Sequence, residues 1–339
     1  MAERQCQHVE VDFTVVGAGI AGMIAAVSAA RQGLKVALIN DRPVPGGNAS
    51  SEIGVAISGA CHQSCNPSVY SKECGIMEEL RNMITEYAAS GGYGEFALLD
   101  AVFFDFLERE KNLVLYLNTT VMEVSEEKGE IISIRAYHSR SEQWFEFVSP
   151  LYADCSGDGI LAFKAGARFR QGRDAKRDFG EFWAPEEGDS TTMGNTVFFE
   201  IEDMGHPVEY HRPAFAYDIT RMEFMKWLDK KENFRSFGVS GKFWTLEIGG
   251  DRNIIKDNEE ITMELRRLVF GIWDYVKNSG RYPNASNYAL KRVYTMAGIR
   301  ESRRFIGEYT LTETDIEEKR RFEDSVCIGG WPMDVPAPK

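Results

Sequence analysis

The first fifty residues combine short apolar runs with a small-residue segment in an order that predicts a β-α-β unit. An apolar run over 13–16 precedes an alanine-rich segment over 21–30, and a second apolar run follows over 35–39. Apolar runs of this length indicate buried strands, and the alanine-rich segment indicates a helix that packs on them. Gly33 lies where such a helix would end. This order is typical of an α/β fold with a parallel sheet.

Helical and strand-like patterns follow this unit. Apolar residues at helical spacing predict helices over 70–90 and 96–110. Short strand-like segments, separated by polar or glycine-containing turns, then stand at 113–117, 120–124, 131–136 and 144–148. We expect these four segments to form a small antiparallel sheet inserted in the α/β fold.

A second combination of strand, glycine turn and helix lies further along the chain. Residues 151–155 predict a strand that returns to the main sheet, and S-G-D-G at 156–159 leads into a short helix over 160–166. Beyond it lie an irregular, aromatic-rich segment and the predicted helices and strand at 169–217, 221–231, 241–250 and 259–279.

These patterns predict three parts of the chain. Residues 10–168 would form the α/β domain, with the small β insertion over 112–149. Residues 169–297 would form a mixed α+β region that caps and shapes the substrate space. Residues 298–339 would return toward the first domain.

The turn after the first strand carries Gly17, Gly19 and Gly22 in G-x-G-x-x-G spacing. The first glycine permits a tight turn, the second lets a pyrophosphate approach the backbone, and the third lets the helix pack closely on its strand. The phosphates would lie near Ile20 and Ala21, where free N–H groups and the helix dipole favour negative charge. The sequence therefore predicts a Rossmann-like dinucleotide site, for either NAD or FAD.

The residues after the second strand extend this predicted site. An acidic residue normally accepts hydrogen bonds from the adenosine ribose there, and this chain has Asn40 followed by Asp41. Either side chain could contact the ribose. Proline, glycine and small residues fill the loop over 42–51, where backbone could come close to a flat ring. The alternative for this loop is an ordinary surface connection.

Composition and charge restrict the partners. With 39 basic and 52 acidic residues, the formal net charge is −13, which argues against nucleic acid and against an anionic membrane surface. No apolar run approaches the ~20 residues that span a bilayer, and the polar N-terminus is unlike a signal peptide, so we expect a cytoplasmic protein. The six cysteines have neither disulfide-framework density nor metal-ligand spacing. We therefore expect reduced thiols and no bound metal.

Taken together, the motifs resemble those of FAD-dependent oxidoreductases. The signatures of that family are V-V-G-x-G-x-A-G, R-P-x-x-G-G-N-x-S-S-E-I, D-x-T-G-D-G and G-I-R-E-S-R-R. In this chain they stand in the same order at 15–22, 42–53, 154–159 and 298–304, with serine at position 156. The resemblance spans residues 12–315. Members of this family look like distant relatives of the fumarate reductase and glutathione reductase flavoproteins.

The resemblance implies FAD as the cofactor and a set of residues that hold it. These residues are Gly17, Gly19, Ile20, Ala21, Gly22, Asn40, Asp41, Arg42, Gly46, Gly47, Asn48, Ser50, Ser51, Gly157 and Asp158. Asp158 has an alternative or additional role, as the cap of a helix that begins at Ile160. Such flavoproteins commonly close the flavin site with a late strand, glycine turn and helix. The residues up to Lys339 lead toward that segment without containing it, so we expect either a truncated sequence or an incomplete flavin site.

Four residues are candidates for catalytic groups that face the flavin ring, namely His62, Arg300, Glu301 and Arg303. An arginine fork can orient a carboxylate or a sugar hydroxyl. The alternative for the arginines is a salt-bridge network at the start of a helix, where Arg300 and Arg304 would share one face. His62 could act as an acid or base near neutral pH, or it could be a structural histidine.

The resulting hypothesis is an FAD-dependent oxidoreductase that transfers a hydride between a small organic substrate and flavin. A carbohydrate or a hydroxy acid is the expected substrate, because either could bind the polar candidate residues. A homo-oligomer is compatible with the sequence. One alternative is an electron-transfer flavoprotein related to heterodisulfide reductase, which needs cysteines spaced for an iron–sulfur centre. The other is a non-catalytic module that binds flavin or another nucleotide. The G-G-N-x-S-S loop favours FAD over NAD.

Overall fold

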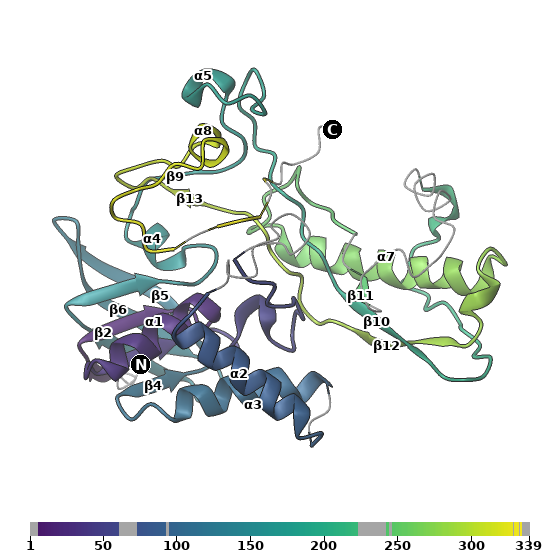
Figure 1. The fold of residues 1–339 in the computed structure, drawn as a ribbon, viewed down its shortest axis with the longest axis horizontal. Coiled ribbons are helices and arrows are strands. Elements are labelled where there is room, and N and C mark those ends of the chain that lie inside the picture. Colours follow the sequence, from purple (N-terminus) through teal and green to yellow (C-terminus); the bar gives the residue numbers. More distant parts are fainter. Residues whose placement is uncertain are drawn as a thin grey trace, which may run out of the picture. The chain divides into compact units, whose positions relative to one another are not determined.

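The computed structural model describes residues 6–60, 73–92, 95–222, 242–243, 246–327, 329–331 and 333. It divides into two compact units, coloured along the sequence in Figure 1. Unit 1 contains Met1–Ser51, Val55–Gly188 and Arg303–Val335, and unit 2 contains Glu52–Gly54, Asp189–Ser302 and Pro336–Lys339.

A parallel sheet forms the centre of unit 1. Its strands, in the spatial order β4-β3-β2-β8, are Leu113–Tyr116, Val36–Ile39, Phe13–Val16 and Leu151–Asp154. All three neighbouring pairs are parallel. Helix α1 (Ile20–Arg31) joins β2 to β3 and confirms the predicted β-α-β unit. The α/β, Rossmann-like fold expected from the sequence is therefore present.

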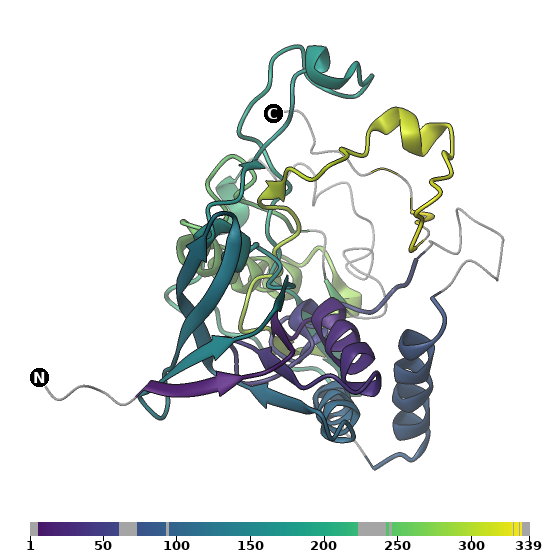
Figure 2. The same ribbon diagram turned by 90° about the vertical axis from the view of Figure 1, so that its left-hand side faces the viewer.

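Both faces of this sheet are covered, because its strands are apolar on both sides. On one face, Val15 and Leu38 pack with α1, α2 (Ile76–Ala89) and α3 (Glu95–Glu108). On the other face, Ala37 and Ile39 pack against a second sheet through residues such as Phe147. Figure 2 shows these layers from the side. Strands buried on both faces read as continuous apolar runs, as this sequence does.

The second sheet has the spatial order β1-β7-β6-β5. Its strands in that order are Cys6–Glu10, Gln143–Val148, Glu130–His138 and Thr119–Glu127. Three of the four predicted inserted strands form it, and they pair antiparallel. The N-terminal strand β1 joins it in parallel with β7.

The placement of 113–117 in this inserted sheet was wrong. The segment forms β4, the edge strand of the parallel sheet, beside β3. Helices α2 and α3 stand between β3 and β4 in the chain, which suits a crossover between parallel strands. Val36 N donates to Asn112 O at 2.8 Å, so the pairing starts directly before β4.

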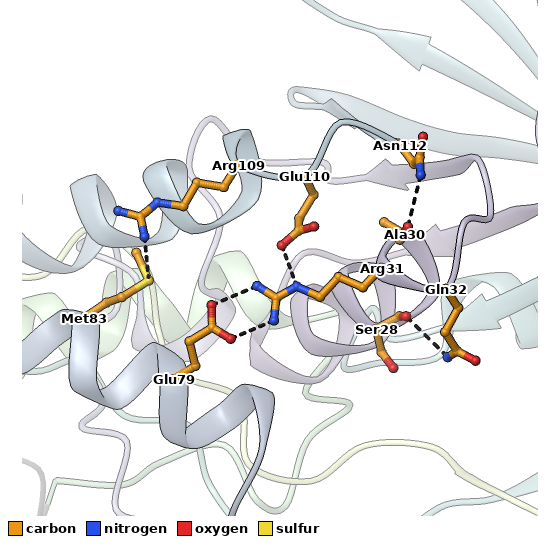
Figure 3. A network of polar contacts seen from close by, with 9 residues as sticks. All are labelled: Ser28, Ala30, Arg31, Gln32, Glu79, Met83, Arg109, Glu110 and Asn112. Atoms are coloured by element: carbon orange, nitrogen blue, oxygen red, sulfur yellow. Dashed lines mark hydrogen bonds and ion pairs between the residues drawn. The ribbon is translucent and has the colours of Figure 1, made fainter.

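An ion-pair network fixes the helices of unit 1 to one another (Figure 3). Arg31, the last residue of α1, donates from Nη1 and Nη2 to Glu79 of α2 at 2.6 and 2.8 Å. Its Nε donates to Glu110, just after α3, at 2.7 Å. The Asn112 side chain also donates to Ala30 O at 3.1 Å. The end of α1 is thereby tied to both neighbouring helices.

Unit 2 combines a small antiparallel sheet with one long helix. The sheet order is β11-β10-β12, formed by Lys242–Phe243, Phe199–Asp203 and Tyr288–Val293. Helix α7 (Asn258–Asn278) buries Val269 and Trp273 in a core shared with β10 and the short 3-10 helices Ile219–Arg221 and Pro283–Ala285. The helix predicted over 259–279 is confirmed. The one predicted over 221–231 lies almost wholly outside the described residues.

Short elements complete unit 1. They are the 3-10 helix Gly47–Ala49, α4 (Ile160–Lys164), β9 (Phe169–Arg170), α5 (Lys176–Phe179), β13 (Arg304–Phe305) and α8 (Glu313–Glu317). Strands β9 and β13 pair antiparallel. Within the described part of the chain, no helix has the length and apolar character needed to cross a membrane.

Candidate cofactor-binding site

Two glycines of the first turn are required by the packing of the protein itself. Gly17 has φ +102°, and a Cβ there would lie 2.3 Å from the carbonyl oxygen of Cys155. A Cβ on Gly22 would lie 1.9 Å from the carbonyl oxygen of Gly17. Gly17 N also donates to Ile39 O at 2.7 Å. The turn therefore packs at the ends of three neighbouring parallel strands, β3, β2 and β8.

Gly19 differs from these two glycines. Its backbone is extended, with φ −67° and ψ 176°, a conformation open to any residue. Among the described residues, the nearest heavy atom to a Cβ on Gly19 is Gly47 Cα, at an ordinary contact distance of 3.8 Å. Neither backbone strain nor packing against the described residues requires glycine here. Close approach of a ligand to the backbone stays the predicted reason for it.

The start of α1 supplies hydrogen-bond donors at this point. Gly19 precedes the helix, and Met23 N donates to Gly19 O at 2.9 Å. By helix geometry, the earlier N–H groups of Ile20, Ala21 and Gly22 have no carbonyl one turn before them in the helix. N–H groups in this position, with the helix dipole behind them, bind phosphate oxygens. The turn therefore fits a pyrophosphate.

The glycine loop after β3 lies directly beside this turn. Gly46 N donates to Ala18 O at 2.7 Å, and Gly19 and Gly46 form an isolated parallel bridge. Gly47 has φ +59°, and its Cβ would lie 2.9 Å from Gly19 Cα. Two segments predicted separately from the sequence thus pack backbone against backbone.

Contacts with α3 hold the far part of this loop. Ser51 N donates to Asp100 Oδ1 at 3.0 Å, and Ser51 Oγ donates to Asp100 Oδ2 at 2.5 Å. A Cβ on Gly46 would lie 2.5 Å from the ring of Phe103. Ser50 is fully buried, and Asn48 is exposed while its carbonyl accepts from Val55 N. The loop is an ordered part of unit 1 and not a free surface connection.

Asn40 links the turn to the loop. It is only 4% exposed, and its Oδ1 accepts from Ala18 N at 3.2 Å. Its Nδ2 donates to the carbonyls of Arg42 and Val44 at 3.1 and 2.9 Å. An amide suits this position because the side chain must accept and donate at once. Asp41 is exposed, and the ribose contact for one of the two residues stays a prediction.

The S-G-D-G turn is organised by residues that sequence reasoning did not select. Asp154 accepts from Ser156 N, Ser156 Oγ and Ala162 N at 3.1, 2.7 and 2.8 Å. Ser156 Oγ in turn accepts from Ile160 N at 3.0 Å. The cap role considered for Asp158 was wrong, since Gly159 precedes α4 and has φ +67°. The signal available in the sequence was an aspartate and a serine just before a short helix.

This second turn meets the first one. Cys155 N donates to Val16 O at 2.7 Å, and Gly17 packs on the backbone of Cys155 and Ser156. Gly157 is exposed with φ +86°, and no described heavy atom lies within 4 Å of a Cβ there. Burial, with a smaller effect of Asp154, raises the pKa of the Cys155 thiol. The thiol is therefore held neutral and is a poor nucleophile.

The charged cluster at 300–304 is extended, so the predicted sharing of a helix face was wrong. Gly298 bridges Thr196, and Arg304 lies in β13, so strand-like pairing at both ends replaces a helix. Arg300 forms an ion pair with Glu247, and Glu301 accepts from Met193 N at 3.2 Å, both within unit 2.

Arg303 belongs to unit 1 and has different contacts. Its Nη1 donates to the carbonyl oxygen of Asp158 at 2.9 Å. Its guanidinium carbon lies 3.9 Å from the centre of the Phe163 ring. Arg303 therefore contacts a predicted cofactor residue. His62 lies outside the described residues, and its role stays a prediction.

The fold and the paired glycine segments define a dinucleotide-binding α/β protein. The chain belongs to the FAD dependent oxidoreductase family, whose sequence profile matches residues 12–339. FAD is thus the cofactor of the family to which this site belongs. No curated protein sequence matches the chain.

Several solved flavoprotein structures are similar to parts of the chain. L-proline dehydrogenase from P. horikoshii is 19% identical over 46% of this chain and 24% of that one, with a TM-score of 0.29. A flavoprotein/dehydrogenase from Cytophaga hutchinsonii is 15% identical over 58% and 47%, with a TM-score of 0.37. A flavocytochrome c3 fumarate reductase is 15% identical over 48% and 41%, with a TM-score of 0.33. The chain spans less than half the length of each.

Proposed function

We propose that this chain binds FAD in unit 1 and takes part in hydride transfer between a small organic substrate and that cofactor. A carbohydrate or a hydroxy acid is the proposed substrate class. The observation that carries the proposal is Gly19, at the start of a helix whose N–H groups can bind phosphate. Neither backbone strain nor packing against the described residues requires a glycine there. The bound flavin supplies the hydride chemistry, and the protein supplies position and charge.

Three segments would hold the cofactor. The N–H groups of Ile20, Ala21 and Gly22 would bind the pyrophosphate. Asp41 is the better ribose ligand of the two candidates, because the donors and acceptor of Asn40 already bind Ala18, Arg42 and Val44. The loop with Gly46, Gly47, Asn48, Ser50 and Ser51 would run beside the flavin ring.

The residues proposed to orient the substrate are His62, Arg300 and Glu301. Arg300 is exposed and paired with Glu247, so its charge is partly compensated before a substrate binds. A guanidinium has several donors in a fixed plane, so it can keep a carboxylate partner and still donate to a substrate carboxylate or hydroxyl. The sequence-based expectation of a cytoplasmic enzyme with no nucleic-acid or membrane partner is part of this proposal.

The absorption spectrum of the purified chain tests cofactor binding first. FAD is added in excess, and unbound FAD is removed by desalting. A retained flavin band, with a stoichiometry near one FAD per chain, supports the proposal. A colourless protein that also fails to quench FAD fluorescence overturns it.

Substrate class is tested on the protein that retains FAD. Sugars and hydroxy acids are added under anaerobic conditions, and loss of the oxidised flavin band is followed. Bleaching by one class, and its loss in Arg300→Met, supports substrate orientation by this arginine. Bleaching by an unrelated class, or equal rates in both proteins, contradicts the proposed substrate or the proposed role of Arg300.

A further inference from the structure

The segment 303–305 contacts the second half of the S-G-D-G turn, in addition to the contacts of Asp154 and Ser156. Arg303 Nη1 donates to Asp158 O at 2.9 Å. Two residues later, the ring of Phe305 lies where a Cβ on Gly159 would be, only 2.0 Å from that position. Contacts from a segment distant in sequence therefore fix both residues that follow Gly157.

Aromatic rings hold the Arg303 side chain in place. Its guanidinium carbon lies 3.9 Å from the centre of the Phe163 ring and 5.6 Å from that of Phe169. The rings of Phe163 and Phe169 meet edge to face at 5.8 Å, and Phe169 pairs with Phe305 across β9 and β13. A planar guanidinium can stack on a ring and donate in its own plane at the same time, which an ammonium cannot do.

The residues before and after Gly157 are held by contacts, whereas Gly157 is not. The Asp154 and Ser156 side chains accept from the backbone N–H groups of Ser156 and Ile160, and Arg303 and Phe305 contact Asp158 and Gly159. Gly157 remains exposed, with no described heavy atom within 4 Å of a Cβ on it. The first glycine turn lies directly alongside, through the contact of Gly17 with Cys155 and Ser156.

We propose that Arg303 is a positioning residue for FAD: acting through the Asp158 carbonyl and the Phe163 ring, it holds the Gly157–Asp158 turn in the conformation that receives the cofactor. This inference rests on the proposed function and replaces the catalytic role expected for Arg303. A segment ordered before binding loses less entropy when the ligand binds. Loss of the contact should therefore weaken FAD binding without removing any group that FAD itself touches.

The test compares Arg303→Lys with Arg320→Lys. Arg320 is a matched control in the same unit, because it also donates hydrogen bonds and lies over aromatic rings, those of Tyr309 and Phe322. We expect the FAD Kd, measured by fluorescence quenching, to rise about tenfold in Arg303→Lys and less than about twofold in Arg320→Lys. Phe163→Leu, which keeps the hydrogen bond and removes the ring, should give an intermediate increase.

Hydrogen exchange of the FAD-free chain gives a second readout that does not depend on cofactor binding. Backbone amides of 157–160 should exchange faster in Arg303→Lys and not in Arg320→Lys. Unchanged exchange together with an unchanged FAD Kd overturns the inference, even where the KM for a substrate rises. If the unaltered chain binds no FAD, the proposed function fails, and the exchange data alone decide whether Arg303 orders the turn.

Discussion

Gly19 and Gly22 lie three residues apart, yet alanine at Gly19 should weaken FAD binding, whereas alanine at Gly22 should lower the stability of the fold. Among the described residues, a Cβ on Gly19 meets only Gly47 Cα at 3.8 Å, whereas one on Gly22 meets the Gly17 carbonyl at 1.9 Å. We expect Gly19→Ala to keep its Tm within about 2 °C and to weaken FAD binding at least about tenfold. Gly22→Ala should lose about 2–4 kcal/mol of unfolding free energy, because backbone must move.

Thermal unfolding without FAD and titration with FAD separate the two outcomes. Gly92→Ala is the matched control, because among the described residues its Cβ would meet only Ser90 Oγ at 3.9 Å. Gly92→Ala should change neither the Tm nor the FAD Kd. If Gly19→Ala binds FAD as tightly as this control, the pyrophosphate does not approach the backbone at Gly19.

The Cys155 thiol should react more slowly than the exposed thiols of Cys74 and Cys327. Its thiol is half-buried, and desolvation followed by the charge of Asp154 raises its pKa, so less thiolate is present at a given pH. Cys74 and Cys327 are exposed. We expect iodoacetamide at pH 8 to label Cys74 and Cys327 well before Cys155, as measured by peptide mass spectrometry. Equal labelling rates would contradict the packing described for the second turn.

At the scale of elements, local sequence patterns predicted the structure correctly where residues that are close in sequence also contact one another. The strand, glycine turn and helix over 13–31 follow from adjacent residues, since Gly17, Gly22 and the alanine-rich helix make one compact unit. The pairing of β4 with β3 does not follow from Leu113–Tyr116 alone, because an apolar run fits either sheet. The extended form of 300–304 depends likewise on Thr196 and Phe169, which are distant in sequence.

Helix α8 depends on its capping residues and should respond to pH. Thr312 N and Oγ donate to Asp315 Oδ2 at 3.0 and 2.9 Å. Hydrogen bonds from Tyr309, then from the Thr312 backbone, hold the pKa of Asp315 well below its usual range. A carboxyl group whose pKa is lower in the folded state than in the unfolded state stabilises the folded state. This contribution is fully present above the unfolded-state pKa, about 4, and is lost as the pH falls toward the folded-state pKa.

Hydrogen exchange over 309–322 checks this expectation. After correction for intrinsic rates, protection should be full at pH 7 and reduced at pH 3. Thr312→Ala removes one cap partner and should reduce protection at pH 7 as well, by an amount that corresponds to about 1 kcal/mol. Protection that is equal at both pH values would show that the Asp315 contacts do not stabilise α8.

The network around Arg31 makes a further prediction for the helix layer. Arg31 binds Glu79 and Glu110 while about a third of its side chain remains exposed. Arg31→Met keeps the apolar stem and removes three hydrogen bonds, so we expect a loss of about 1 kcal/mol in unfolding free energy. Chemical denaturation at low and high salt measures it. The difference from the unaltered chain should shrink at high salt, because partly exposed ion pairs are screened.

At the scale of the whole molecule, the net charge of the chain acts against association with an anionic cofactor. The formal charge is −13, and the pyrophosphate of FAD is anionic, so the long-range field repels FAD while the helix N-terminus attracts it only at short range. Raising NaCl from about 20 to 200 mM shortens the Debye length from roughly 20 Å to below 10 Å. The association rate of FAD, measured by stopped-flow quenching, should therefore rise with salt. Choline chloride should give the same increase if screening is the cause, and a rate that falls with salt would instead require a basic entry path to the site.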